Sequence, residues 1–205
     1  MKNTALTVFL VLAGLAQVVD LGAVEVGADV KAANKLLETM QMAASGTGLS
    51  AAEARLPKPI EAGVLALFPE PFEGWRAGPP RAREDLATQA MVANSYLRRY
   101  LREDGAQVTL GLVIDAPIFP FLSMAVRAPL ASGKHDDLKA YTLYTLDEWS
   151  GTLDREGEES YTITLVIEDR LLVQGHSTGT PDPCALDEYI RALDVDAILA
   201  VLPKK

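Results

Sequence analysis

The sequence predicts an α+β fold in which a mainly antiparallel sheet of about five strands is covered by helices, with an N-terminal helix. Residues 108–114 alternate between apolar and polar side chains directly after the turn pair Asp104-Gly105. A second run, 161–167, alternates in the same way. Apolar residues recur at helical spacing near both ends of the chain. These signals favour a layered α+β fold over a doubly wound parallel sheet.

Residues 1–23 are predicted to be a cleavable signal peptide. A short basic start with Lys2 precedes the apolar run 4–19, which is the secretory pattern. The run is shorter than the roughly 20 apolar residues that a membrane span needs. Ala16 and Ala23 are both suitable for the last position before the cut, and we keep both open. An uncleaved helix that tethers the domain to a membrane is the alternative.

Residues 24–80 are predicted to form an N-terminal helix and a proline-rich segment packed on the core, ahead of an α+β domain over 81–205. Apolar residues of 26–44 recur at helical spacing. Ser50 and Glu53 match the capping box of a short helix. Prolines and glycines exclude long regular elements from 58–80. That stretch also carries apolar residues that favour contact with the core: Leu65, Leu67, Phe68, Phe72 and Trp75.

The stretch 86–102 fits either a helix or a strand, and its neighbour decides between them. An Asp-Gly pair suits the positive φ angles of a tight hairpin. Because such a pair stands at 104–105, just before the alternating run, we predict a hairpin of 95–103 with 106–114.

A helix and three strands are predicted after the hairpin. Asp115 can cap a helix whose first turn holds two prolines and which ends at Pro129. Polar turns are expected at residues 154–159 and 168–170. A last helix is predicted to begin after Asp182-Pro183 and either to continue past Asp194 or to break there. The three strand-like stretches are 139–149, 161–168 and 171–175.

Composition excludes several classes of function. The formal net charge is -9 and the sequence pI is about 4.7, which argues against nucleic-acid binding because phosphate contacts need clustered Lys and Arg. Cys184 is the only cysteine, so no intrachain disulfide can form. The chain has no Gly-Xaa-Ser-Xaa-Gly motif and no phosphate-binding glycine loop. No cofactor is predicted.

Histidine and cysteine chemistry is weakly supported by the sequence. His135, Asp136 and Asp137 could form a metal site with His176, but a solvated turn explains the cluster better because divalent sites need three or four ligands on defined elements. Cys184 stands at a predicted helix start, where the dipole can lower a thiol pKa. Without a histidine at fixed spacing, we interpret it as an ordinary helix-start residue.

Charged clusters are interpreted as structural, with a chemical alternative for each. The carboxylates of 156–159, close to Asp154, could act as an acid-base pair or bind calcium, but a charged hairpin tip is the simpler interpretation. Arg98, Arg99 and Arg102 are expected to form ion pairs, with an anion contact as the alternative.

The two tryptophans are the candidate partner surface. Tryptophan supplies large contact areas at recognition sites, although it is buried in cores at least as often. We expect Trp149, at the end of a strand, to be more exposed than Trp75.

Three motifs resemble a group of short exported bacterial proteins of unassigned function. They are Pro71-Phe72-Glu73-Gly74-Trp75, then Arg98-Arg99-Tyr100 before Asp104-Gly105-Ala106-Gln107-Val108-Thr109, then Asp115-Ala116-Pro117. The order of motifs covers roughly residues 65 to 200. The architecture looks similar to the PsbP and Mog1 type of α+β fold. The resemblance implies export and a sheet with helices, and no catalytic residue.

These observations predict a periplasmic or secreted accessory or binding protein without catalytic activity. Its expected partner is another envelope protein or a small ligand, with no nucleic acid and no membrane contact after signal cleavage. A hydrolase-type enzyme that uses scattered carboxylates and a membrane-tethered subunit of an envelope assembly are the alternatives.

Overall fold

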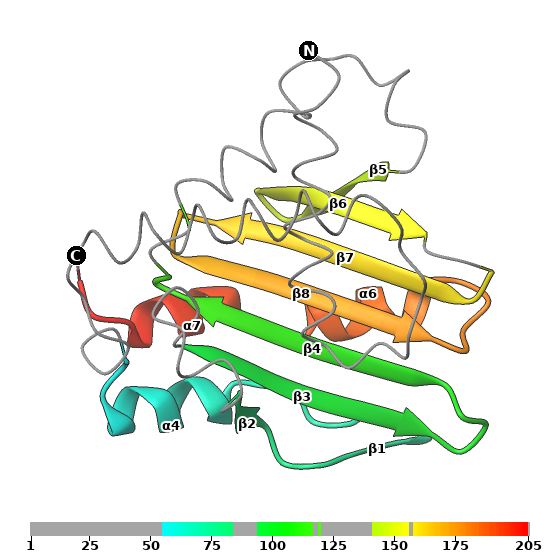
Figure 1. Cartoon of the computed structure of the whole chain (residues 1–205), viewed down its shortest axis with the longest axis horizontal. Helices are drawn as coiled ribbons and strands as arrows, with labels where there is room; N and C mark the ends of the chain where they lie inside the picture. The colour runs from blue at the N-terminus through cyan, green and yellow to red at the C-terminus, as the bar shows by residue number, and fades with distance from the viewer. Residues whose placement is uncertain (1–54, 84–93, 117–118, 120–140, 156–157, 205) are drawn as a thin grey trace, which may run out of the picture.

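A computed structural model describes residues 55–83, 94–116, 119, 141–155 and 158–204. These residues form one antiparallel sheet with helices on one side of it (Figure 1). The sheet order is β1-β3-β4-β8-β7-β6-β5, and β2 also pairs with β3. The strands are β1 (Trp75–Ala77), β2 (Arg81–Ala82), β3 (Ser95–Arg102), β4 (Gln107–Ile114), β5 (Tyr141–Leu146), β6 (Trp149–Arg155), β7 (Ser160–Ile167) and β8 (Leu171–Thr178). The helices are α4 (Lys58–Ala66), α6 (Cys184–Arg191) and α7 (Val195–Val201).

The predicted α+β class with an antiparallel sheet is confirmed, but the prediction of about five strands is wrong. Among the described residues the sheet has 8 strands. Two of the additional strands, β1 and β2, are short and lie in a proline-rich stretch. The third is β6, which begins at Trp149, where the predicted strand 139–149 ends, and runs into the predicted turn at 154–159. The predicted helices over 26–44 and after Ser50 and Asp115 lie outside the described residues.

The predicted hairpin of 95–103 with 106–114 is confirmed as β3 and β4. Arg102 N–H donates to the Ala106 carbonyl at 2.9 Å, which closes the hairpin. Of the two residues in the Asp104-Gly105 pair, only Gly105 takes the expected positive φ, at 92°. Asp104 stabilises the turn in another way, because its carboxylate accepts the Ala106 N–H at 3.1 Å.

Strand β8 is longer than predicted because Gly175 does not end it. A Cβ built at Gly175 would come within 2.5 Å of Leu186 Cδ1 and 2.8 Å of Ile190 Cδ1, both on α6. The missing side chain therefore lets α6 pack closely on the sheet. Figure 1 shows α6 and α7 together on this side of the sheet.

The face that the helices cover holds the hydrophobic core. Alternate residues of each strand point to this face, and the cluster continues into the helices. Its fully buried members include Leu110, Leu112, Ile163, Leu165, Leu171, Val173, Leu186, Ile190 and Ile198.

The opposite face of the sheet is polar at its centre. Thr109, His176 and Thr162 are directly paired across β4, β8 and β7, so they share that face. The alternation of the sequence predicts that this second face is wet or lightly covered, and the structure shows a covered centre, because Thr162 and His176 are only 5% and 6% exposed. Buried polar groups require partners, and Thr162 Oγ1 lies 3.0 Å from His176 Nδ1.

Arg98 holds the proline-rich segment against the sheet. Its guanidinium donates to the Phe68 and Pro69 carbonyls at 3.2 and 2.8 Å. It also donates to the Gly78 carbonyl at 3.2 Å and to the Glu70 carboxylate at 3.0 and 3.1 Å. Arg98 therefore binds several points of the stretch between α4 and β2, together with the Tyr100 hydroxyl, which donates to the Pro69 carbonyl at 2.8 Å, and the pairing of β1 with β3.

The last helix was predicted either to continue past Asp194 or to break there, and the structure shows a break, with α6 before Asp194 and α7 after it. The Asp194 carboxylate accepts the Ala197 N–H at 2.8 Å and so caps α7. The carboxylate of Asp182 accepts the Cys184 N–H at 2.9 Å at the start of α6. None of the helices in the described part of the chain is both long and apolar enough to cross a membrane.

Candidate functional site

A pocket of about 370 Å³ lies where the β5–β6 turn faces the junction of α6 and α7. This volume is in the range of small-ligand sites. Buried core residues form its floor: Leu146, Leu193 and Val195. The rest of the lining is Asp147, Glu148, Trp149, Asp194 and Asp196.

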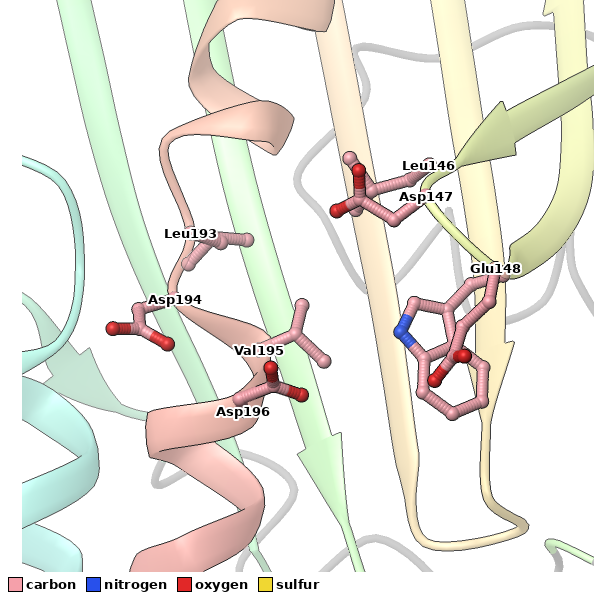
Figure 2. A pocket seen from close by; sticks show the side chains of 8 residues that line it. Leu146, Asp147, Glu148, Leu193, Asp194, Val195 and Asp196 are labelled. Atoms are coloured by element: carbon pink, nitrogen blue, oxygen red, sulfur yellow. The ribbon is translucent and has the colours of Figure 1, made fainter.

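Four acidic residues from two distant segments line this pocket. Figure 2 shows Asp194 and Asp196 at the start of α7 on one side, with Asp147 and Glu148 of the β5–β6 turn on the other. The Asp194 carboxylate is directed away from that turn and caps α7. All four residues are exposed. Among the described residues that line the pocket, none is basic. The arrangement therefore favours a positively charged occupant, because focused negative charge attracts cations.

Backbone geometry places the carboxylates. Asp147 takes a left-handed conformation with φ 50°, which turns β5 directly into β6. Aspartate is one of the few non-glycine residues that tolerate this conformation. On the other side, the cap that Asp194 forms on α7 fixes the direction in which the helix starts.

Hydrogen bonds between α6 and β5 hold the two sides of the pocket together. The Tyr144 hydroxyl donates to Asp187 Oδ1 at 2.7 Å, and Arg191 Nε donates to Asp187 Oδ2 at 2.9 Å. Arg191 also donates to the Thr145 carbonyl at 3.3 Å. Burial, and then the hydrogen bond to Asp187, raise the pKa of the Tyr144 hydroxyl, so Tyr144 remains a neutral donor at neutral pH.

Trp149 lines the pocket, although it does not end a strand as the sequence suggested. It begins β6 and is half-buried against the core cluster. The indole therefore has one side anchored by packing and contributes to the pocket wall. An aromatic ring beside carboxylates is a suitable surface for an ammonium or guanidinium group.

Trp75 lies at the other end of the sheet. It is also half-buried and meets Tyr189 edge to face, with ring centroids 5.7 Å apart. The Arg102 guanidinium lies 5.1 Å from the centroid of the Trp75 ring. The structure does not bring the two tryptophans to one site, since β1 and β5 are at opposite edges of the sheet.

Two of the three clustered arginines form the predicted ion pairs. Arg98 binds Glu70 at 3.0 Å, and Arg102 binds Asp104 at 2.7 Å. The hydrogen bond from Arg98, and then its charge, lower the pKa of Glu70. Arg99 forms no ion pair with the described residues.

The thiol and imidazole candidates show no catalytic arrangement within the described part of the chain. Cys184 is exposed, and its hydrogen bond with Asp182 raises the pKa of the thiol rather than lowering it. His176 contacts Thr162 in the buried face. Outside the described residues lie His135, Asp136 and Asp137, together with Glu156 and Gly157 at the start of the 156–159 tip. In the ranges that are described, no three His, Cys, Asp or Glu residues are grouped to hold a metal ion.

Sequence reasoning missed the pocket carboxylates. Asp147-Glu148 is a charged pair between two strand-like runs, and that interruption is the signal that could have identified the turn. Comparisons with protein-family models, curated proteins and solved structures found no match for this chain. The resemblance to exported bacterial proteins therefore stays a prediction.

Proposed function

We propose that this chain is an exported accessory or binding protein without catalytic activity, whose pocket at Trp149 receives a cationic group. The group would belong to a small ligand or to a basic segment of a partner protein in the periplasm or outside the cell. The observation that carries the proposal is the half-buried residue Trp149 in a pocket lining that also holds four acidic residues.

Physical chemistry supports a cation at this place. A cation over an indole ring is stabilised by about 0.5–2 kcal/mol, and more where water is excluded. Nearby carboxylates add charge-assisted hydrogen bonds. The carboxylates stand on turns and a helix start, so a ligand can be held without moving the core.

Fluorescence can test this pocket directly. The chain contains two tryptophans, so Trp75→Phe leaves Trp149 as the only indole. With a lysine tripeptide as probe, we expect a saturable change of Trp149 emission. Asp147→Asn with Glu148→Gln should weaken binding about tenfold or more, because each lost charged contact is worth roughly 1.5–3 kcal/mol. Asparagine also tolerates the left-handed backbone at position 147.

A matched control separates the pocket from the overall acidity of the protein. Glu73→Gln with Glu103→Gln removes two negative charges near the β1–β3 edge, far along the sheet from the pocket. Its affinity for the tripeptide should equal that of the parent. Equal weakening in both variants, or an emission that never changes, would contradict the proposal.

Export is tested separately. Expression of the full chain, followed by fractionation and mass analysis of the N-terminus, should yield a soluble periplasmic or secreted protein that starts after Ala16 or Ala23. An intact N-terminus in the membrane fraction would instead support the tethered envelope subunit.

The hydrolase alternative is favoured by the same carboxylates, since an acid and a base on opposite sides of a pocket suit hydrolysis. Turnover of generic ester, phosphate or peptide substrates that is lost in Asp147→Asn would establish it in place of a pure binding function.

A further inference from the structure

The edge of the sheet farthest from the pocket is rich in arginine. Strands β1, β2 and β3 contain five arginines, and neither they nor β4 contain an aspartate or glutamate. In a chain of net charge -9, this is a local reversal of sign. The five residues are Arg76, Arg81, Arg98, Arg99 and Arg102.

Three of these arginines share the polar face of the sheet, opposite the helices. Arg76 pairs with Leu101 and Arg81 pairs with Leu97, and both partners stand two positions from Arg99 on β3. Directly paired residues and alternate residues of a strand share a face. Diagonal neighbours of this kind are about 7–8 Å apart, a gap that arginine side chains can close. We call Arg76, Arg81 and Arg99 the arginine triad.

The triad differs from the other two arginines in its partners. Arg98 and Arg102, on the helix-covered face, bind Glu70 and Asp104. Within the described ranges, no side-chain hydrogen bond or ion pair holds any member of the triad. Arg99 Nε is buried without a hydrogen-bond partner, a state that costs stability unless a ligand supplies an acceptor.

Gly111 presents no side chain beside Arg99. It stands on β4, opposite Leu97 and on the same face. A Cβ built there would approach only two backbone oxygens, at 3.6 and 3.9 Å, and no described side chain within 4 Å. Thr109, directly opposite Arg99, adds a hydroxyl that already accepts a hydrogen bond from Gln107 Nε2 at 3.2 Å.

From these observations we propose that the arginine triad is a binding site for the phosphate group of a soluble small molecule. Guanidinium groups bind phosphate oxygens through paired N–H donors, and three of them on one face suit a dianion better than a single carboxylate. This site is independent of the acidic pocket, which lies at the opposite edge of the sheet.

Calorimetric titration of the full chain with inorganic phosphate, at ionic strength kept constant with sodium chloride, tests the site. We expect saturable binding that Arg99→Gln weakens about tenfold or more, the usual effect of losing a charge-assisted pair. Arg102→Gln is the matched control, since it removes the same charge from the same strand on the other face. Its affinity should match that of the parent.

A second variant covers the case in which Arg99→Gln does not fold. Arg76→Gln with Arg81→Gln changes two exposed side chains, and it should weaken phosphate binding while the circular dichroism spectrum stays unchanged. Absence of saturable binding, or equal weakening by Arg102→Gln, would overturn the proposal. It would also be overturned if the triad bound only vesicles of anionic phospholipid, or if its loss only dissolved an oligomer of this chain.

Discussion

The two edges of the sheet carry opposite charge and use it in the same way. At the β5–β6 edge, Asp187 is occupied by Tyr144 and Arg191, whereas Asp147 and Glu148 face the pocket. At the β1–β3 edge, Arg98 and Arg102 are occupied by carboxylates, whereas the triad has no ion pair within the described part of the chain. At both edges, charges that support the fold have partners, and the two proposed sites concern the other charges.

The edges differ in how deeply the charged side chains that support the fold are buried. Arg98 has a side chain only 9% exposed and joins five acceptors of one segment, whereas Arg191 and Asp187 are 50% and 34% exposed. Buried charges lose far more than exposed ones when their partners are removed. The comparison therefore predicts that the basic edge depends more on one residue than the acidic edge does.

Removal of Arg98 should have the largest effect on stability. Arg98→Met keeps the apolar stem but leaves the Phe68 and Gly78 carbonyls without the Arg98 donor, whereas the Pro69 carbonyl still accepts from the Tyr100 hydroxyl. We expect a loss of about 2–4 kcal/mol in the free energy of unfolding, measured by urea denaturation, because two carbonyls lose their donor. Arg102→Met, on the same strand and face, should cost much less because its ion pair is exposed. Similar losses for both variants would contradict the comparison.

Two glycines give the next contrast. A Cβ at Gly151, on β6, would overlap the Thr164 backbone carbonyl, so Gly151→Ala should cost about 1–3 kcal/mol or more. Gly111→Ala, near the basic edge, meets only ordinary contacts and should change stability by about 0.5 kcal/mol or less. Thermal unfolding of the two variants measures both effects. A larger loss of stability for Gly111→Ala than for Gly151→Ala would contradict the close approach of β6 and β7 at Gly151.

Local signals explain which parts of the fold could be predicted. The β3–β4 hairpin was predictable because the Asp104-Gly105 pair and the alternation that follows act within a few residues. The β5–β6 turn was missed because Asp147 takes a left-handed backbone without help from glycine. Gly175 was misinterpreted as a strand end because its role depends on α6, which is distant in sequence.

The sites depend on contacts that no local pattern encodes. Trp149 could be selected from the sequence, but its carboxylate neighbours Asp194 and Asp196 come from a helix start far along the chain. The three clustered arginines looked equivalent in sequence. Strand alternation separates Arg99 from Arg98, and only the pairing of β1 and β2 with β3 brings Arg76 and Arg81 to its side.

The smallest predicted effect concerns the exposed half of the Arg98 ion pair. The hydrogen bond from Arg98 lowers the pKa of Glu70, so the pair contributes its stability above the ordinary glutamate pKa and loses it as the pH falls through the lowered value. Glu70→Gln should therefore be less stable than the parent at pH 7, and the difference should disappear in acid. Glu73→Gln, in the same segment, is the control, because the ion pair of Arg98 is with Glu70 and not with Glu73. Unfolding midpoints measured from pH 7 to pH 2 decide, and a constant difference would mean that packing rather than charge connects Glu70 to the sheet.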